Sequence, residues 1–295
     1  MLTIEFDYLG VLGNLVELAG SGHVRRGRTS TPWVSLSAPI FIDFYVGAGC
    51  RLPLLTTKKM HTRSILAELV WFLRGDTNVR WLQAHGVTIW DEWADAAGNL
   101  GPVYGHQWRR WRDERSGTSI DQVQRVIDGW LRDPYDRGLV VSAWNVADLG
   151  SMALRPCHYA WQITCPEPGV MDIHVQQRSA DWFLGVPYNL ASYSALLILL
   201  AKAVGVTPGT VWWSGADCHL YLNHVEAAQR QLAVRAAALE SAFTGTDRYT
   251  APCLVVSDEA DIYYAVTDEG ALTLDMFEVT GYNPVGPVIR APVAV

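Results

Sequence analysis

Residues 190–204 read Leu-Ala-Ser-Tyr-Ser-Ala-Leu-Leu-Ile-Leu-Leu-Ala-Lys-Ala-Val. A helix with this sequence is apolar on nearly every side, and such a helix is buried in the centre of a fold. Residues 139–144, 158–165 and 171–178 precede it and are rich in β-branched and aromatic residues, a composition typical of strands. We therefore expect a central buried helix packed against a β-sheet.

Three other segments predict helices. The first covers residues 60–74 and is expected to end at Gly75. The second begins at the capping box Ser119-Ile-Asp-Gln122 and ends at Asp133-Pro134, and the third covers residues 219–238. The apolar residues at helical spacing are Ile65, Leu66, Leu69, Phe72 and Leu73 in the first helix and Ile120, Val123, Ile127 and Trp130 in the second.

Strands and helices in this order predict an α+β fold, with a mixed β-sheet partly covered by helices. We expect a single domain over residues 1–295, because no linker, repeat or low-complexity segment interrupts them. Residues 244–270 are the least patterned part. With 49% hydrophobic residues, the chain can build a large core, which excludes a disordered or fibrous protein.

The charges argue against a nucleic-acid-binding protein. Lys and Arg number 23 and Asp and Glu number 30, which gives a net charge of −7, whereas proteins that bind DNA usually present a basic surface. Five cysteines without a C-x-x-C pair, and no signal-like start, predict the reducing cytoplasm. We expect no membrane span, because Ser192, Ser194 and Lys202 interrupt the longest apolar stretch, residues 190–206.

Cys157 lies in Leu154-Arg-Pro-Cys-His158, at the start of a predicted strand. Taken alone, this segment favours a buried structural thiol, which is what most single cysteines are. The functional alternative is a nucleophile whose pKa is lowered by the neighbouring Arg155 and His158.

Two polar segments beyond this strand suggest contacts with a ligand. The pair Arg178-Ser179 suits a phosphate, through guanidinium contacts and a hydroxyl donor, and the alternative is a surface ion pair of Arg178 with Asp181. Asn189 precedes the buried helix, where it is either an N-cap or an amide that reads a heterocycle.

The segment Asp217-Cys-His-Leu-Tyr221 alternates polar and apolar residues at the predicted start of a helix. His219 and Tyr221 suit hydrogen bonds to sugar hydroxyls. A metal site is a weak reading, because no second His or Cys pair has ligand spacing, and we expect no metal.

Glu68 is a carboxylate on an otherwise apolar helical face, where it must find a partner or titrate with a raised pKa. Trp90, Trp93 and Tyr104 form an aromatic cluster in the sequence. Core packing is the default reading for such residues, and a stacking wall for a flat ligand is the alternative.

Together these segments resemble one enzyme family, thymidylate synthase. Single short motifs often mislead, but ten in register over most of a chain rarely do. The resemblance runs from about residue 28 to residue 295 and weakens between residues 232 and 276. The segments are Leu54-Leu-Thr-Thr-Lys58, Glu68-Leu-Val-Trp-Phe-Leu-Arg-Gly-Asp-Thr77, Val87-Thr-Ile-Trp-Asp-Glu-Trp-Ala94, Gly101-Pro-Val-Tyr-Gly-His-Gln-Trp108, Val141-Ser-Ala-Trp-Asn145, Pro156-Cys-His158, Gln177-Arg-Ser179, Gly185-Val-Pro-Tyr-Asn-Leu-Ala-Ser-Tyr193, Asp217-Cys-His-Leu-Tyr221 and Ala291-Pro-Val-Ala-Val295.

The resemblance implies C5 methylation of dUMP to dTMP, with 5,10-methylenetetrahydrofolate as co-substrate and dihydrofolate as the second product. Cys157 would add to C6 of dUMP and make C5 nucleophilic. Glu68 would act through water as a proton relay, and Tyr104 would assist loss of the C5 proton. Asn189 would read the uracil edge, and Asp217 would support the site.

The other binding residues follow from the same resemblance. The substrate contacts implied are Arg28, Arg137, Arg178, Ser179, Asn189, His219 and Tyr221, with Arg178 also counted among the catalytic residues. The folate contacts implied are His61, Ile89, Trp90, Asp181, Leu184, Gly185, Tyr188 and Ala294. Arg137 would come from the other subunit of a homodimer that associates through the sheet.

Two departures from the family pattern affect the grip on the phosphate. The family usually has two adjacent arginines where this chain has Arg137-Gly138, and Arg109, Arg110 and Arg132 are the candidates to replace the missing one. A glycine-rich loop of the family appears here as Arg28-Thr-Ser-Thr-Pro-Trp33, which is stiffer.

Two other functions compete with dTMP synthesis. A sister enzyme on the same fold, a deoxypyrimidine nucleotide 5-hydroxymethylase acting on dUMP or dCMP, would use the same folate but quench the intermediate with water. A nucleotide- or RNA-binding relative without activity ranks last, because a binding module would not need Cys157, Glu68, Tyr104 and Asn189 together.

Overall fold

The computed structural model describes residues 3–27, 29–113, 115–242, 251–263, 265 and 272–293, without the side chains of Thr3 and residues 235–242. Its helices are α1 (Thr3–Gly20), α2 (Thr62–Leu73), α3 (Arg80–Ala84), α4 (Tyr104–Arg109), α5 (Gln122–Arg132), α6 (Val186–Val204) and α7 (Val225–Ala242), with 3₁₀ turns at Asp91–Trp93, Leu222–His224 and Leu274–Met276. Its strands are β1 (Trp33–Ser35), β2 (Ile40–Tyr45), β3 (Trp111–Arg112), β4 (Ser119–Ile120), β5 (Val140–Ser142), β6 (His158–Thr164), β7 (Val170–Asp181), β8 (Thr207–Tyr221), β9 (Cys253–Val256) and β10 (Phe277–Thr280).

The main sheet of the described residues has six strands and is mixed, which confirms the expected α+β class. Its order is β1-β8-β7-β6-β5, with β2 also paired to β8. The β7–β8 pair is parallel, whereas β5–β6, β6–β7, β1–β8 and β2–β8 are antiparallel. Parallel neighbours need a crossover connection, and α6 is that connection.

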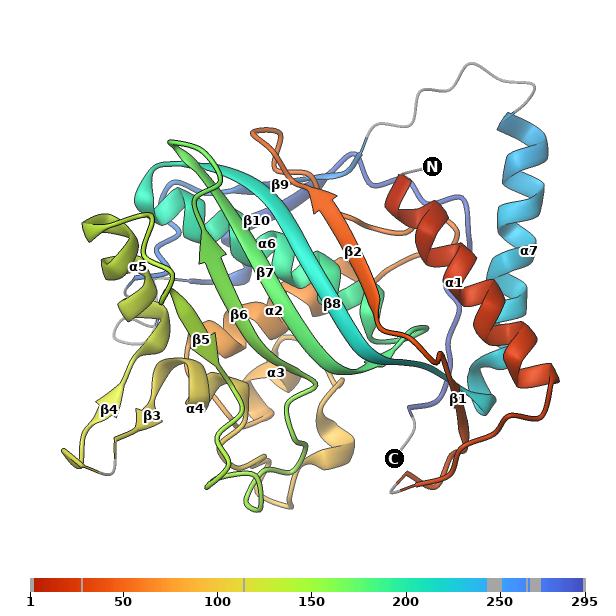
Figure 1. The fold of residues 1–295 in the computed structure, drawn as a ribbon, viewed down its shortest axis with the longest axis horizontal. Helices are drawn as coiled ribbons and strands as arrows, with labels where there is room; N and C mark the ends of the chain where they lie inside the picture. Colours follow the sequence, from red (N-terminus) through yellow and green to blue (C-terminus); the bar gives the residue numbers. More distant parts are fainter. Residues whose placement is uncertain are drawn as a thin grey trace.

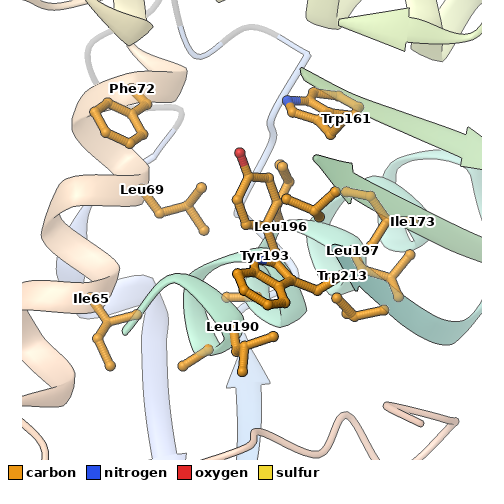
Figure 2. Packing of buried hydrophobic residues seen from close by; sticks show 14 of the residues in the cluster. Ile65, Leu69, Phe72, Trp161, Ile173, Leu190, Tyr193, Leu196, Leu197 and Trp213 are labelled. Carbon is orange, nitrogen blue, oxygen red and sulfur yellow. The ribbon is translucent and has the colours of Figure 1, made fainter. Parts of the chain in front are cut away.

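Alternate side chains of the strands point to opposite faces of the sheet. One face is covered by α6, and α2 packs on the other side of α6; in Figure 1 the strands lie in front of these two helices. Figure 2 shows Ile65 and Leu69 of α2 on one side of α6, with Trp161, Ile173 and Trp213 of the strands on the other. The core therefore has three layers: α2, then α6, then the sheet.

The central helix α6 is buried along nearly its whole length. Pro187 lies in its first turn, where the missing N–H costs nothing. It ends at Gly205, which has the left-handed φ of 71° that favours glycine. The helix thus begins four residues before the apolar stretch 190–204 and ends where that stretch predicted.

Helix α6 is also the single described helix that is long and apolar enough to cross a membrane by length and composition. Within the protein, 78% of its apolar window is buried. Burial of this kind is typical of a core helix, because a spanning helix would present its sides to lipid.

Two predicted helix boundaries were wrong. Residues 219–221 belong to β8, and the long helix begins only at Val225. The polar and apolar alternation of this segment is the period of a strand. Likewise, Ser119 and Ile120 pair with β3, and α5 is capped by Asp121, whose side chain accepts from the backbone N–H of Gln124 at 2.9 Å.

The N-terminal helix α1 was not predicted, although Tyr8, Leu12 and Leu15 lie on one buried face. It also carries Glu5, a fully buried carboxylate. Glu5 accepts four hydrogen bonds of 2.7–2.8 Å from the backbone N–H groups and hydroxyls of Thr56 and Thr57. A side chain of α1 thereby fixes the turn that precedes α2.

We predict that Glu5→Gln lowers the free energy of unfolding by about 2 to 4 kcal/mol, because an amide nitrogen would then face fixed N–H donors in a buried site. Urea unfolding measures this loss. Glu17→Gln, on the exposed side of the same helix, is the control and should change stability by less than about 0.5 kcal/mol. A Glu5→Gln protein as stable as the control would contradict the anchoring role.

Candidate active site

Cys157 lies just before β6 and is partly exposed. Its backbone N–H donates to the Tyr104 hydroxyl at 2.7 Å, and its carbonyl accepts from the backbone N–H of Arg178 at 2.8 Å. Helix α4 and strand β7 therefore hold the cysteine backbone from two sides. The backbone from which the thiol projects is therefore held in place, and the side chain keeps some access to solvent, as a nucleophile requires.

The neighbouring His158 does not have the role that the nucleophile alternative gave it. Its ring is buried, stacks on the Tyr104 ring at 4.2 Å, and its Nδ1 lies 2.8 Å from the Tyr193 hydroxyl. Burial lowers the pKa of His158 to about 3. The ring is therefore neutral at pH 7, and it supplies no positive charge that could lower the pKa of the thiol.

Arg178 wraps the segment before the cysteine. Its Nε donates to the Pro156 carbonyl at 2.9 Å and its Nη2 to the Arg155 carbonyl at 3.0 Å, while the guanidinium lies over the Trp144 ring. Arg178 therefore makes these contacts, and not the ion pair with Asp181 that the sequence left as an alternative. A guanidinium has five donors, so Arg178 keeps donors for an anion.

Asn189 lies in the first turn of α6 and is not its N-cap, which is Gly185. Its Oδ1 accepts from Gln177 Nε2 at 3.2 Å. The Gln177 Oε1 in turn accepts from the Trp213 indole at 3.0 Å. Because an indole N–H can only donate, the chain Trp213–Gln177–Asn189 fixes both amide orientations, and Asn189 presents its NH₂ group away from Gln177.

Asp217 and His219 lie at the end of β8, beside Ser179 and Asp181 of β7 in the parallel register. Asp217 accepts from the Ser35 hydroxyl at 2.7 Å, and His219 Nδ1 lies 3.5 Å from its carboxylate. A hydrogen bond from His219 holds the pKa of Asp217 below its usual range. Burial alone would lower the pKa of His219, but Asp217 and Asp181 raise it overall.

Tyr221 follows at the end of β8, with its ring edge-on to His219 at 5.0 Å. Trp33, one of the departures from the family pattern, packs against both rings at 6.4–6.5 Å. Backbone hydrogen bonds between Arg25 and Trp33 close the preceding loop, and Arg25 Nη1 lies 3.7 Å from Asp217. Trp33 at the end of this loop therefore packs directly against His219 and Tyr221, the pair predicted to bind the sugar.

Glu68 projects from α2 toward the aromatic cluster. Its Oε1 accepts from the Trp90 indole N–H at 2.7 Å. Burial raises the pKa of Glu68 to about 7, although the hydrogen bond from Trp90 lowers it. Trp90 is itself buried among Trp71, Phe72 and Tyr104, so it orients Glu68 more than it offers a wall to a ligand.

Tyr104 packs against Trp90, the hydrogen-bond partner of Glu68, and its hydroxyl contacts the Cys157 backbone. It is almost fully buried, and burial together with the nearby Cys157 and Tyr193 raises its pKa well above the usual value. The hydroxyl is therefore protonated at neutral pH. It accepts from the Cys157 N–H, so its own proton remains available to a ligand or water.

Most of the residues predicted to bind the folate lie around the start of α6. Asp181 Oδ1 accepts from the backbone N–H groups of Phe183 and Leu184 at 3.0 and 3.1 Å. Tyr188 accepts from the backbone N–H of His61 at 3.3 Å. The backbone N–H of Gly185 donates to the Asp181 carbonyl, and Ile89 is largely exposed.

The C-terminal segment lies beside this group. The Gly286 N–H donates to the Thr56 carbonyl at 2.8 Å, and the Lys59 N–H donates to the Pro287 carbonyl at 3.0 Å. A Cβ on Gly286 would lie 1.9 Å from the Thr57 carbonyl oxygen, so only glycine allows this approach. Residues 286 and 287 thus pack against the turn at residues 56–59, which Glu5 holds in place.

The structure does not bring every predicted residue into this group. Arg28 and Ala294 lie outside the described residues. Arg137 is exposed in the turn before the edge strand β5, where its carbonyl accepts from Gln162. Arg109, a candidate to replace a phosphate arginine, is buried 2.9 Å from Asp121 and is committed to that pair.

Sequence reasoning missed Gln177 as the residue that orients Asn189, and it missed Lys58. Burial lowers the pKa of Lys58 to about 7, and its Nζ donates to the Phe183 carbonyl at 2.5 Å. Both residues belong to segments that carry the resemblance. The buried hydrogen bond from Trp213 fixes the orientation of Gln177 and burial lowers the pKa of Lys58, and the burial of these two residues has no signature in the sequence.

One comparison with known proteins bears on this site. A family model described as thymidylate synthase matches residues 8–295. The match contains all ten segments of the resemblance and begins earlier than expected, within α1. The predicted family resemblance is therefore confirmed over nearly the whole chain.

We predict that Glu68→Gln becomes progressively more stable than the wild type as pH rises from 5 to 8. With a pKa of about 7 in the folded state, Glu68 holds a proton that the unfolded chain has already lost, so wild-type stability falls as pH rises toward and through 7. The expected gain for the glutamine is about 1 to 3 kcal/mol at pH 8.

Urea unfolding at each pH measures the difference between the two proteins, which should be smallest below about pH 4, where folded and unfolded wild type are both largely protonated. A difference that stays constant over this range would show that Glu68 is not desolvated in the folded protein.

Proposed function

The chain belongs to the thymidylate synthase family, and from its site we propose that it methylates dUMP at C5 to give dTMP, with methylenetetrahydrofolate as co-substrate and dihydrofolate as second product. The family supports folate-dependent one-carbon transfer to a deoxypyrimidine nucleotide. The observation that carries the methylation proposal is the backbone clamp on Cys157, which ties the nucleophile to Tyr104 and Arg178.

Cys157 is the nucleophile in this proposal. Its sulfur bonds to C6 of dUMP, and the electrons of the C5–C6 double bond move toward C5 and the O4 carbonyl. When bound, methylenetetrahydrofolate supplies the one-carbon unit and the hydride. In the last step the C6–sulfur bond breaks, the double bond reforms, and Cys157 is free for another turnover.

The orientation of Asn189 supports uracil as the base. Its Oδ1 is engaged by Gln177, so its NH₂ faces the ligand as a donor. Uracil offers an acceptor at O4, and its N3–H can share the Asn189 oxygen, whereas cytosine would present an amino group to an amino group. The Trp213 indole holds Gln177 and opposes the amide flip that would admit cytosine.

Glu68 and Tyr104 are the proton-transfer groups. A carboxyl group with a pKa of about 7 can both accept and return a proton at neutral pH. The protonated Tyr104 hydroxyl lies against the Cys157 backbone and can orient a water that takes the C5 proton. Asp217 supports the site by fixing His219, which with Tyr221 binds the 3′-hydroxyl.

The phosphate is assigned to Arg178, Ser179 and Arg28, together with Arg137 of a second subunit. The folate residues fit their ligand chemically: Asp181 is an acceptor for the N–H groups of a pterin, and Ile89 adds exposed apolar surface. Segment 286–293 is hydrogen-bonded to Thr56, Lys59 and His224 beside these residues, and in the proposal it shields the bound folate from water. This favours hydride transfer over the hydroxymethylase alternative, which needs water as reactant.

A homodimer through the sheet is part of the proposal. The face of the sheet opposite α6 carries Phe41, Tyr45 and Trp212, which are 76%, 57% and 44% exposed. A hollow of about 460 Å³ opens on the same face, and Arg178 lies in its lining. A second copy covering this face would bury the aromatic side chains and bring its Arg137 to the phosphate.

We also propose a cytoplasmic enzyme without DNA or membrane partners. The acidic charge supports this, as does the absence of a disulfide among the cysteines of the described residues.

We predict that the protein converts dUMP and methylenetetrahydrofolate to dTMP and dihydrofolate in equal amounts, measured by mass spectrometry of the nucleotide and absorbance of the folate. Cys157→Ser should lower kcat by on the order of 10³-fold or more. Cys165→Ser, at the other end of β6, is the matched control and should keep full activity. A product heavier than dTMP by one oxygen, formed without dihydrofolate, would establish the hydroxymethylase instead.

A shared site predicts complementation between two inactive proteins, Cys157→Ala and Arg137→Ala. A heterodimer of the two contains one intact site, so an equal mixture should recover about a quarter of wild-type activity after subunit exchange. Activity is measured before and after exchange, with exchange followed by native mass spectrometry of tagged chains. Heterodimers that form without recovering activity would place Arg137 outside the partner's site.

A further inference from the structure

His224 is a fully buried residue to which the proposed reaction assigns no role. It ends the 3₁₀ turn Leu222–His224, between β8 and α7. One ring nitrogen, Nε2, lies 2.7 Å from the Pro292 carbonyl oxygen, and the other, Nδ1, lies 3.8 Å from Asp181 Oδ1. The ring therefore stands between the C-terminal segment and a residue proposed to bind the folate.

The chemistry of the two neighbours orients the imidazole. A carbonyl oxygen can only accept, so Nε2 carries the proton of that hydrogen bond. Nδ1 is buried and makes no hydrogen bond within the described residues, since 3.8 Å is beyond hydrogen-bond range. With the proton on Nε2, the neutral ring presents a lone pair at Nδ1, so a hydrogen bond from Nδ1 to the Asp181 carboxylate requires the ring to shift its proton from Nε2 to Nδ1.

Asp181 lies 3.8 Å from His224 Nδ1 and is held in place by the backbone. Its Oδ1 accepts from two backbone N–H groups at the start of α6. Burial opposes its ionisation, but His224 and His219 together hold the pKa of Asp181 below its usual range. The carboxylate is thus charged and shared between the histidine and any ligand donor.

The C-terminal segment has two separate attachments. Gly286 and Pro287 are hydrogen-bonded to the backbone at Thr56 and Lys59. Nearer the end of the described chain, Pro292 is bonded to His224. The second attachment is the one that lies next to Asp181.

We propose that His224 is a positioning residue that couples the seating of residues 286–293 to the state of Asp181. When Asp181 is bonded to a ligand, the ring keeps its proton on Nε2 and its bond to Pro292, and the segment stays in place. When the segment leaves, Nε2 loses its acceptor, the ring changes to the tautomer with the proton on Nδ1, and Nδ1 donates to Asp181. The proposal rests on the proposed function only in naming the ligand of Asp181 as the folate.

Two conservative variants separate the bond to Pro292 from the approach to Asp181. In His224→Gln the amide nitrogen can occupy the place of Nε2 and donate to Pro292, whereas in His224→Asn the shorter side chain can reach only the place of Nδ1. His224→Leu removes both contacts, and Asn223→Ala, at the exposed neighbouring position, is the control.

Amide hydrogen exchange of residues 286–293 in the ligand-free protein is the direct test. His224→Leu and His224→Asn should exchange at least about fivefold faster than the wild type, and His224→Gln and Asn223→Ala should stay close to it. Asp181→Asn should change the exchange of the wild type but not that of His224→Leu, because the coupling passes through the ring.

Steady-state kinetics give the second readout. If the proposed function holds, His224→Leu raises the KM for methylenetetrahydrofolate by at least about fivefold, with little change in the dissociation constant of dUMP. Equal exchange in all variants, or additive effects of Asp181→Asn and His224→Leu, would overturn the coupling. A wild type with the predicted exchange pattern but no turnover of dUMP would refute the proposed function and leave the coupling standing.

Discussion

The parallel pairing of β7 with β8 is the constraint on which the rest of the site depends. Its register sets Ser179 beside Asp217 and Asp181 beside His219. The same pairing requires a crossover, which α6 provides while it fills the core behind the sheet. A slip of one residue would turn every side chain of a strand to the opposite face, so the register that buries the core also assembles the site.

The sequence could predict the elements whose pattern is local. The apolar run of α6 and the spacing in α2 needed no knowledge of the fold. The end of β8 was mistaken for a helix because a long strand paired on both edges is recognised only once its neighbours are known. Helix α1 shows a clear apolar face, but its importance comes from Glu5, whose partners lie about fifty residues away.

The candidate site also combines features that the sequence could predict with features that it could not. The residue types at Cys157, Arg178 and Asn189 could be selected from the sequence, because each has a chemical use in its motif. The environment that gives each its state could not. A charge on His158 beside the thiol was the functional alternative, and the structure shows a neutral, buried ring instead. Core packing was the default expectation for Trp90 and is confirmed by its burial, but the sequence did not show that its indole orients Glu68. The burial of His158 and Trp90 determines what each side chain does, and burial follows from the packing of the whole fold rather than from a local sequence pattern.

The central claim is that this register builds one deoxyuridylate site around Cys157. Peptide mass spectrometry after incubation with 5-fluoro-dUMP and methylenetetrahydrofolate tests it most directly, because fluorine at C5 has no proton to lose and the covalent complex accumulates. We predict a stable adduct of nucleotide and folate on Cys157 alone among the five cysteines. An unmodified Cys157, or an adduct on another cysteine, would contradict it.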